Sequence, residues 1–119
     1  MNELSGKTCA PCSKGAVPLT ADEASRLLNK IPGWEIVRTA DTPSLQCYFD
    51  FKNFQQALNF TNRVGDLAEQ ENHHPQIITE WGRVTVRWWT HKIKGLHQND
   101  FIMAAKTSSL FNGQSPDPL

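Results

Sequence analysis

Three stretches of the chain place apolar residues at the spacing of an amphipathic helix. The first is predicted between Thr20 and Pro32-Gly33, the second from about Phe54 to about Glu71, and the third from near His97 to Leu110. The positions that define these stripes are Ala24, Leu27, Leu28 and Ile31 in the first helix, Phe54, Ala57, Leu58, Thr61, Val64 and Ala68 in the second, and Phe101, Ile102, Ala105, Ser109 and Leu110 in the third.

Helix ends are marked by residues that satisfy free backbone groups. Thr20 is followed three residues later by Glu23, the spacing of a capping box. Asn53 is a predicted N-cap, with Gln56 three residues on. The second helix must stop before Pro75, because the residue preceding a proline avoids the helical region.

Four shorter runs have the composition or the alternation of β-strands. Trp34–Arg38 and Leu45–Phe51 flank turn residues at 41–44 and predict a first hairpin. Gln76–Glu80 and Arg83–His91 predict a second one around Trp81-Gly82. In the last run, Val84, Val86 and Trp88 fall on one face, and Thr85, Arg87, Trp89 and His91 fall on the other, if no bulge intervenes.

The element order is helix, strand, strand, helix, strand, strand, helix. It predicts an α+β fold, a four-stranded antiparallel sheet with three helices on one face. The second sheet face or an edge strand would then be exposed, which favours a homodimer or homotetramer. We expect a single domain over residues 20–111, a flexible N-terminal arm over 1–19 and a loose C-terminal tail over 112–119.

Charge and cysteine content exclude several classes of protein. Twelve basic residues balance twelve acidic ones, so we do not expect a nucleic-acid partner. No uncharged stretch, residues 107–116 included, is long enough to span a membrane. Three cysteines are too few for a disulfide scaffold, and a cytoplasmic location is the simplest expectation. Cys9 and Cys12 have redox or half-zinc-site spacing but no second pair follows, so a mobile arm with two thiols is favoured over a disulfide or an adventitious metal.

Three of the four histidines lie at the ends of predicted elements. His73 and His74 precede the third strand, and His91 closes the fourth. Counting outward from the hairpin turn, Gln76 lies opposite Arg87, so all three histidines gather at one end of the second hairpin. They are then within reach of a common ligand.

Simpler readings of the same residues exist. Histidines at a helix end often only interact with the last carbonyls, and one at a strand end is usually solvated. Three imidazoles could also hold a zinc ion. Trp88 and Trp89 are consecutive and point to opposite faces, so one is expected in the core and the other is a candidate for stacking on a planar ligand.

A more specific pattern appears when these residues are combined. Glu69–Pro75 contains the sequence Glu-Gln-Glu-Asn-His-His-Pro, and it is followed by Thr90-His91 and by Gly95-Leu96 to Asp100. The chain therefore resembles the pterin-4a-carbinolamine dehydratases, also known as dimerization cofactors of a homeodomain transcription factor, over about Leu19 to Leu110. The resemblance also includes Gly33-Trp34, Asp50-Phe51-Lys52-Asn53-Phe54, Thr61-Asn62-Arg63-Val64 and Ala68-Glu69.

The resemblance implies a hydro-lyase. Members of the family dehydrate the 4a-hydroxytetrahydropterin that aromatic amino acid hydroxylases produce, for example in phenylalanine hydroxylation. This dehydration recycles a tetrahydrobiopterin-type cofactor. The implied catalytic residues are His73, His74 and His91. The resemblance implies Glu69, Trp34 and Asp100 as further site residues. We also expect Trp81 and Thr90 to contribute to substrate binding, and we expect no cofactor or metal.

The chain departs from the family pattern at two positions. Many members have Asp where this chain has Asn72, so no carboxylate at that position orients His73. Many have Ser at the cap of the last helix, where His97 predicts a weaker cap.

These residues suggest a mechanism. We expect His73 and His91 to flank C4a of the pterin and to exchange acid and base roles, because imidazole exchanges protons near neutral pH. His74 would orient the pterin, Glu69 would set a histidine tautomer or bond the pterin, and Trp34 or Trp81 would wall the pocket. The alternative is an interaction module without catalysis that stabilises or regulates a partner protein through its helix surfaces.

Overall fold

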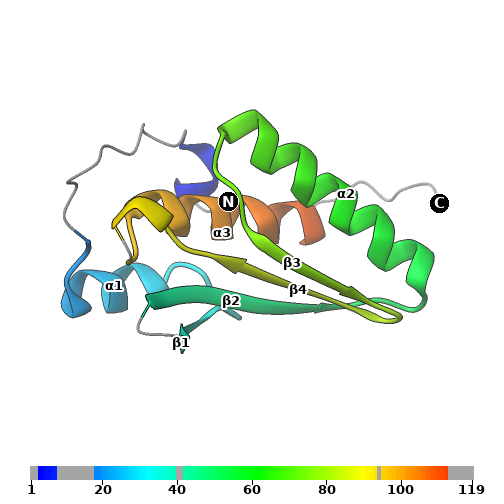
Figure 1. Cartoon of the computed structure of the whole chain (residues 1–119), viewed down its shortest axis with the longest axis horizontal. Helices are drawn as coiled ribbons and strands as arrows, with labels where there is room; N and C mark the ends of the chain where they lie inside the picture. The colour runs from blue at the N-terminus through cyan, green and yellow to red at the C-terminus, as the bar shows by residue number, and fades with distance from the viewer. Residues whose placement is uncertain (1–2, 8–17, 40–41, 94, 113–119) are drawn as a thin grey trace.

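A computed structural model describes residues 3–7, 18–39, 42–93 and 95–112. Its centre is a four-stranded antiparallel sheet with the strand order β1-β2-β4-β3 (Figure 1). The predicted α+β class and the antiparallel sheet are confirmed. The strands are β1 Glu35–Thr39, β2 Thr42–Asp50, β3 Gln76–Glu80 and β4 Arg83–Trp88, and the helices are α1 Ala21–Leu28, α2 Phe54–Glu71 and α3 Gln98–Asn112. Two short 3-10 helices, η1 Glu3–Gly6 and η2 His91–Ile93, complete the described elements.

The first helix begins with the predicted capping box. The Thr20 hydroxyl accepts a hydrogen bond from the Glu23 backbone N–H (3.2 Å), and the Thr20 N–H donates to the Glu23 carboxylate (2.9 Å). The α-helix ends at Leu28, before the predicted stop at Pro32-Gly33. The chain then makes a turn in which the N–H of buried Ile31 donates to Leu28 and Gly33 adopts a φ of 93°, a value that favours glycine.

The second helix has the predicted bounds, and Asn53 caps it by accepting from the Gln56 N–H (2.9 Å). At its other end Asn72 adopts a left-handed conformation, with φ 55° and ψ 42°. The His73 N–H reaches back to the Ala68 carbonyl (3.1 Å), which completes a Schellman-type end. Asn tolerates this conformation better than most residues, so residue 72 fixes where His73 leaves the helix.

The apolar stripe predicted for α2 is only partly the buried face. Ala57, Val64 and Ala68 are buried as predicted, whereas Phe54 and Leu58 remain 46% and 36% exposed. Phe60 lies outside the predicted stripe and is buried against the rings of Phe49 and Phe51. Which aromatic rings of α2 are buried therefore depends on the elements that pack against the helix, and not on the helical period alone.

Both predicted hairpins form, and Gln76 pairs with Arg87 as expected. Two boundaries differ from the prediction. Residues 42–44, expected in a turn, belong to β2, where Ser44 pairs with Val37. The fourth strand ends at Trp88, because Thr90 forms an isolated bridge with Gly95 and His91 begins η2. His91 therefore does not continue the alternation of β4.

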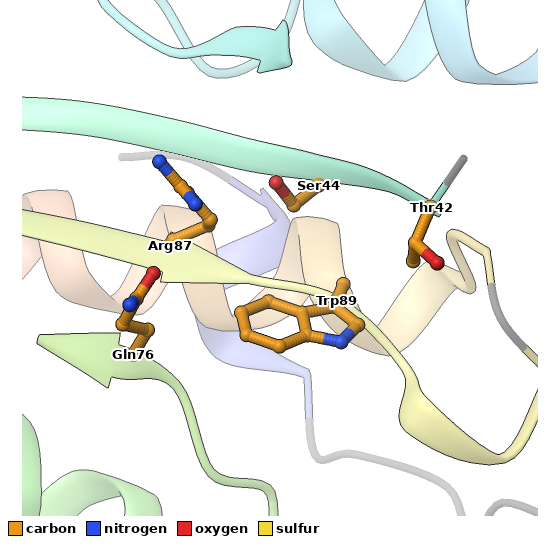
Figure 2. Close-up of a pocket in the computed structure, with 5 residues that line it drawn as sticks. All are labelled: Thr42, Ser44, Gln76, Arg87 and Trp89. Carbon is orange, nitrogen blue, oxygen red and sulfur yellow. The ribbon is translucent and has the colours of Figure 1, made fainter. Parts of the chain in front are cut away.

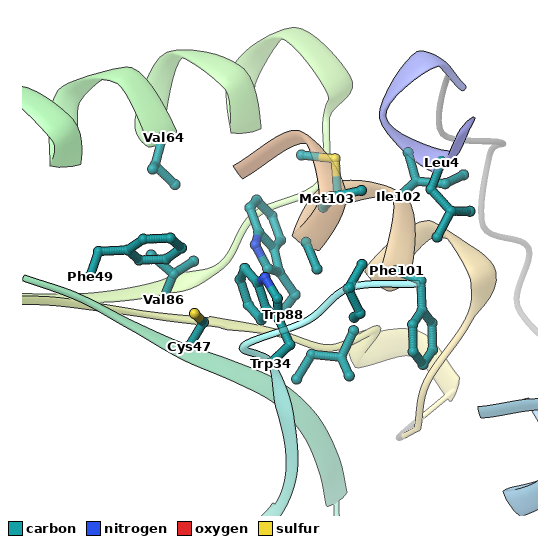
Figure 3. Packing of buried hydrophobic residues seen from close by; sticks show 14 of the residues in the cluster. Leu4, Trp34, Cys47, Phe49, Val64, Val86, Trp88, Phe101, Ile102 and Met103 are labelled. Carbon is teal, nitrogen blue, oxygen red and sulfur yellow. The ribbon is translucent and has the colours of Figure 1, made fainter. Parts of the chain in front are cut away.

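The core lies between the sheet and its helices (Figure 3). Trp88 is fully buried there, and its indole N–H donates to the Thr107 hydroxyl (3.1 Å), so Trp88 is the core member of the tryptophan pair. Leu4 is also in the core, only 1% exposed, and η1 packs on α3. Burial of Leu4 thus holds this turn against α3, whereas the flexibility of the arm predicted over residues 1–19 stays a prediction.

Other predictions about the chain ends stay predictions. Cys9, Cys12 and the segment 113–119 lie outside the described residues. Within the part of the chain that the structure describes, no helix combines the length and the apolar character that crossing a membrane requires.

Candidate active site

One buried carboxylate connects three separate segments of the chain. Asp100, in the first turn of α3, is fully buried. Its Oδ1 lies 2.7 Å from Nε2 of His73, and its Oδ2 accepts from the Thr90 hydroxyl (2.8 Å) and from the His97 N–H (2.9 Å). These bonds satisfy a carboxylate that would otherwise be costly to bury. Asp100 thus ties the end of α2 and the end of β4 to the start of α3.

His73 is held on several sides. Its ring is parallel to the Trp88 indole, with a 7° interplanar angle and 5.8 Å between centroids, and only 11% of its side chain is exposed. With the Asp100 carboxylate as acceptor, Nε2 is the donor and a neutral ring keeps Nδ1 as an acceptor. The tautomer of His73 is thereby set by Asp100 and not by residue 72.

His74 faces a different direction. Its Nε2 lies 2.6 Å from Oε2 of Glu69, and the two side chains are 55% and 77% exposed. Both line an open groove of about 550 Å³ beside α2 and β3. The groove is also lined by Thr61, Asn62, Gly65, Asp66, Ala68, Pro75 and Ile77. The predicted pairing of Glu69 with a histidine is thus present in the geometry, and that histidine is His74.

His91 is exposed at the start of η2. Its ring centroid lies 4.6 Å from that of Trp89, at an interplanar angle of 43°. Its chain neighbour Thr90 is the residue that Asp100 holds. His73 and His91 therefore belong to segments joined through one carboxylate, although their rings face different surroundings.

A second pocket lies beside Trp89 (Figure 2). It has a volume of about 280 Å³ and is lined by Thr42, Ser44, Gln76, Arg87 and Trp89. Arg87 is fixed there because its Nε and Nη2 both donate to Oε1 of Gln46, at 3.1 and 2.6 Å. The sequence indicated Trp89 as a candidate for stacking but gave no signal for the other four.

The two tryptophans predicted as pocket walls lie in different surroundings. Trp34 is 5% exposed, its indole N–H donates to Ser108 (2.8 Å), and it packs edge-on against Phe49 in the core. Trp81 is 71% exposed at the β3–β4 turn, the end of this hairpin opposite His73 and His91. Within one chain, Trp81 cannot wall a cavity that contains those histidines.

The cap of α3 is more complete than the sequence suggested. Nδ1 of His97 accepts from the Asn99 N–H (3.0 Å), while the His97 N–H donates to Asp100. A histidine ring and a carboxylate thus form a reciprocal cap of the capping-box type. The expected weakness of this cap is not evident in its hydrogen bonds.

A zinc site is the other hypothesis for the three histidines. Among residues 3–7, 18–39, 42–93 and 95–112, no group of three or more His, Cys, Asp or Glu side chains is arranged to hold a metal ion.

Comparison with known proteins places this geometry in a family. Residues 17–110 match the family model described as pterin 4 alpha carbinolamine dehydratase. The chain belongs to this family. The resemblance found in the sequence is confirmed, and the family's name denotes a hydro-lyase.

Relatives that carry the family name cover nearly the whole chain. A protein from Chlorobium limicola is 56% identical over 113 residues, which is 95% of this chain and 100% of the relative. One from Microcystis aeruginosa is 50% identical over 115 residues, 97% of this chain and 99% of its own length. These lengths show that the similarity extends beyond the histidine motifs.

Two solved structures share the pterin dehydratase fold. The first, from Brucella melitensis, is described as a transcriptional coactivator/pterin dehydratase. It has a TM-score of 0.72 and 28% identity, covering 80% of this chain and 99% of that one. The second, a pterin dehydratase-like RuBisCO assembly factor of the alpha-carboxysome, has a TM-score of 0.57 and 21% identity, covering 67% and 90%. At that identity the second comparison supports the fold alone.

Proposed function

We propose that this protein dehydrates a 4a-hydroxytetrahydropterin to the quinonoid dihydropterin and water. The C4a–O bond breaks, the N5 proton leaves to a base, and the departing oxygen receives a proton from an acid. The reaction needs no oxidant or reductant, because the electron pair of N5 expels the hydroxyl group from C4a. The chemistry therefore needs two proton-transfer groups and a site that orients the ring.

His73 and His91 are the proposed proton-transfer pair at C4a. The observation that carries this assignment is the Asp100 carboxylate, which binds His73 directly and binds Thr90, the neighbour of His91. A buried carboxylate that orients an imidazole keeps it in one tautomer, as proton transfer requires.

His74 and Glu69 have a supporting role in the proposal. Their 2.6 Å contact on an exposed groove supports a function in orienting the pterin. Thr90 and Asp100 act as positioning residues in this scheme, because both are buried and reach the substrate only through the histidines. Trp34 and Trp81 are not included as walls of the pocket.

The proposed biological setting is the recycling of a tetrahydrobiopterin-type cofactor. Aromatic amino acid hydroxylases generate this substrate, so a metabolic link to such an enzyme, for example in phenylalanine hydroxylation, follows from the reaction. We also propose a cytoplasmic homodimer or homotetramer, since the sheet leaves two edge strands, β1 and β3.

The test is a set of His73→Ala, His91→Ala and double variants, assayed by the loss of the carbinolamine ultraviolet signal. Each well-placed proton transfer contributes about 10²- to 10⁴-fold to a rate, so each single variant should lose activity on that scale. His97→Ser replaces the one histidine outside the proposed site and should keep turnover within a few fold. Wild-type turnover in the double variant would overturn the assignment.

A second candidate function is an interaction module that stabilises or regulates a partner. Phe54 and Leu58, exposed and one turn apart on α2, favour it because they form an apolar strip on a helix surface. The pterin dehydratase-like RuBisCO assembly factor has the same fold without close sequence similarity. Partner effects that survive the His73/His91 double variant but not Phe54→Ser with Leu58→Ser would support this function.

A further inference from the structure

We propose that Trp89 is the aromatic wall of the substrate site and that Arg87 recognises the C4 carbonyl of the pterin. The planar pyrimidinone half of the substrate would stack on the indole, in the pocket lined by Thr42, Ser44, Gln76, Arg87 and Trp89. This inference rests on the proposed function, because it uses His91 as a group that acts at C4a.

The strand register places the pocket on the sheet face away from the core. Arg87 pairs with Gln46 on one side and with Gln76 on the other, so these three side chains share one face. Trp88 points into the core, and Trp89, one residue later, lines the pocket on the other side. Figure 2 shows the indole along the end of β4, with Gln76 and Arg87 towards one end of it and Thr42 beyond the other.

His91 connects this pocket to the proposed chemistry. Its ring packs against the Trp89 indole with 4.6 Å between centroids. A general acid or base must lie within about 2.6–3.2 Å of the atom it serves. If C4a of the bicyclic pterin lies that close to His91, the rest of the ring system extends over the indole of Trp89, which packs against His91.

The guanidinium of Arg87 is preorganised to bind a carbonyl oxygen. Two of its five N–H donors bond to one Gln46 oxygen, and Gln46 is only 5% exposed. The Gln46 amide in turn donates to Glu35 (3.2 Å) and to the Tyr48 hydroxyl (3.2 Å). The guanidinium is thus held in one orientation before a ligand arrives, which favours binding.

The polar lining matches the edge of a pyrimidinone. That edge presents a carbonyl acceptor together with N–H and amino donors. Arg87 supplies only donors, whereas the Gln76 amide and the Ser44 and Thr42 hydroxyls can both donate and accept. An aromatic wall with a few convergent polar groups, in a pocket of about 280 Å³, fits a small flat heterocycle.

The tests of the wall are Trp89→Ala and Trp89→Phe, with binding of 7,8-dihydrobiopterin measured by calorimetry beside KM and kcat. Stacking on an aromatic residue typically changes affinity by about 10- to 100-fold, so Trp89→Ala should raise Kd and KM on that scale. Trp89→Phe should stay within about fivefold of wild type, since a ring remains.

Arg87→Gln has a matched control in Arg83→Gln, because both arginines lie on the same face of β4 and Arg83 pairs with Asp50 outside the pocket. The two probes are 2-amino-4-oxopteridine and 2,4-diaminopteridine. At C4 the first has a carbonyl acceptor and the second an amino donor, and N3 changes with it from an N–H donor to an acceptor. Wild type and Arg83→Gln should prefer the oxo compound by about tenfold or more, as expected for a charge-assisted hydrogen bond. Arg87→Gln should lose most of that preference.

The outcomes separate this inference from the proposed function. Unchanged pterin affinity in Trp89→Ala, with turnover still lost in His91→Ala, would overturn the pocket and leave the reaction standing. A wild-type protein that neither binds 7,8-dihydrobiopterin nor accelerates carbinolamine loss would overturn both.

Discussion

His73 and Asp100 are joined by a 2.7 Å contact between Nε2 and Oδ1, across 27 positions of the sequence. Asp100 is fully buried, and the His73 side chain is 11% exposed. The carboxylate also accepts from Thr90 and from the backbone of His97, so one side chain fixes both the fold and the tautomer of the histidine. This dual role can be separated by substitution.

Asp100→Asn should lower turnover far more than it lowers stability. The Asn carbonyl can still accept from Thr90 and His97, but its NH₂ group faces Nε2 of His73 and favours the opposite tautomer. We expect turnover to fall by about 10²- to 10⁴-fold, the scale of a misplaced proton transfer. The free energy of unfolding should fall by about 1–3 kcal/mol, the scale of a disturbed buried polar group.

The matched control is Asp50→Asn, which removes an exposed carboxylate that pairs with Arg83. An exposed ion pair contributes at most about 1 kcal/mol, so this variant should change neither quantity much. Steady-state kinetics and urea unfolding measure both effects. Turnover within threefold of wild type in Asp100→Asn would contradict the tautomer argument.

Glu69→Gln should affect substrate binding but not stability. Glu69 and His74 are both largely exposed, so their contact contributes little to folding. If Glu69 orients His74 against the pterin, the variant should raise KM by about three- to tenfold, the scale of one modest hydrogen bond. Glu80→Gln, an exposed glutamate at the far end of β3, should leave KM unchanged. Equal KM values in the two variants would argue against a role for Glu69.

The ring of His97 should be replaceable as a helix cap. His97→Ala removes the acceptor for the Asn99 N–H and should cost about 1 kcal/mol of unfolding free energy. His97→Ser restores a capping oxygen and should recover most of that loss. Both variants keep the backbone N–H that donates to Asp100. Denaturant midpoints of the three proteins measure the difference, and an undiminished midpoint in His97→Ala would show that the ring contributes nothing.

Burial of Cys47 predicts a loss of stability at alkaline pH. Desolvation raises the pKa of its thiol to about 11, and a smaller opposing effect comes from the hydrogen bond to the Tyr48 backbone. The thiol of the unfolded chain ionises at about pH 8.5. Its contribution is therefore complete below that pH and is lost as the pH rises to about 11, because only the unfolded chain has then released the proton.

Urea unfolding at pH 7 and pH 10 checks this prediction against Cys47→Val, which keeps an apolar side chain of similar size. The wild type should lose more stability between the two pH values than the variant does. In a Cys9→Ser, Cys12→Ser background, native Cys47 should also react slowly with iodoacetamide at pH 8. Equal losses in both proteins, or rapid alkylation, would contradict a buried and protonated thiol.

Local structure could be predicted from the sequence because it depends on near neighbours. The bounds of α2, the caps at Thr20 and Asn53 and the pairing of Gln76 with Arg87 follow from side-chain chemistry and strand counting alone. The end of β4 did not follow, because it depends on a bridge between Thr90 and Gly95 that no local pattern announces.

The sequence also determined which residues could carry the chemistry, since His73, His74, His91, Glu69 and Asp100 stand in a recognisable spacing. Only the tertiary structure decided how they are used. In the folded chain the adjacent His73 and His74 contact different carboxylates. Trp34 is buried, Trp81 is exposed at the far turn, and Trp89 lines a pocket. The physical reason is that spacing fixes the side of a strand or helix on which a residue lies, while its contacts depend on the elements that pack against that side.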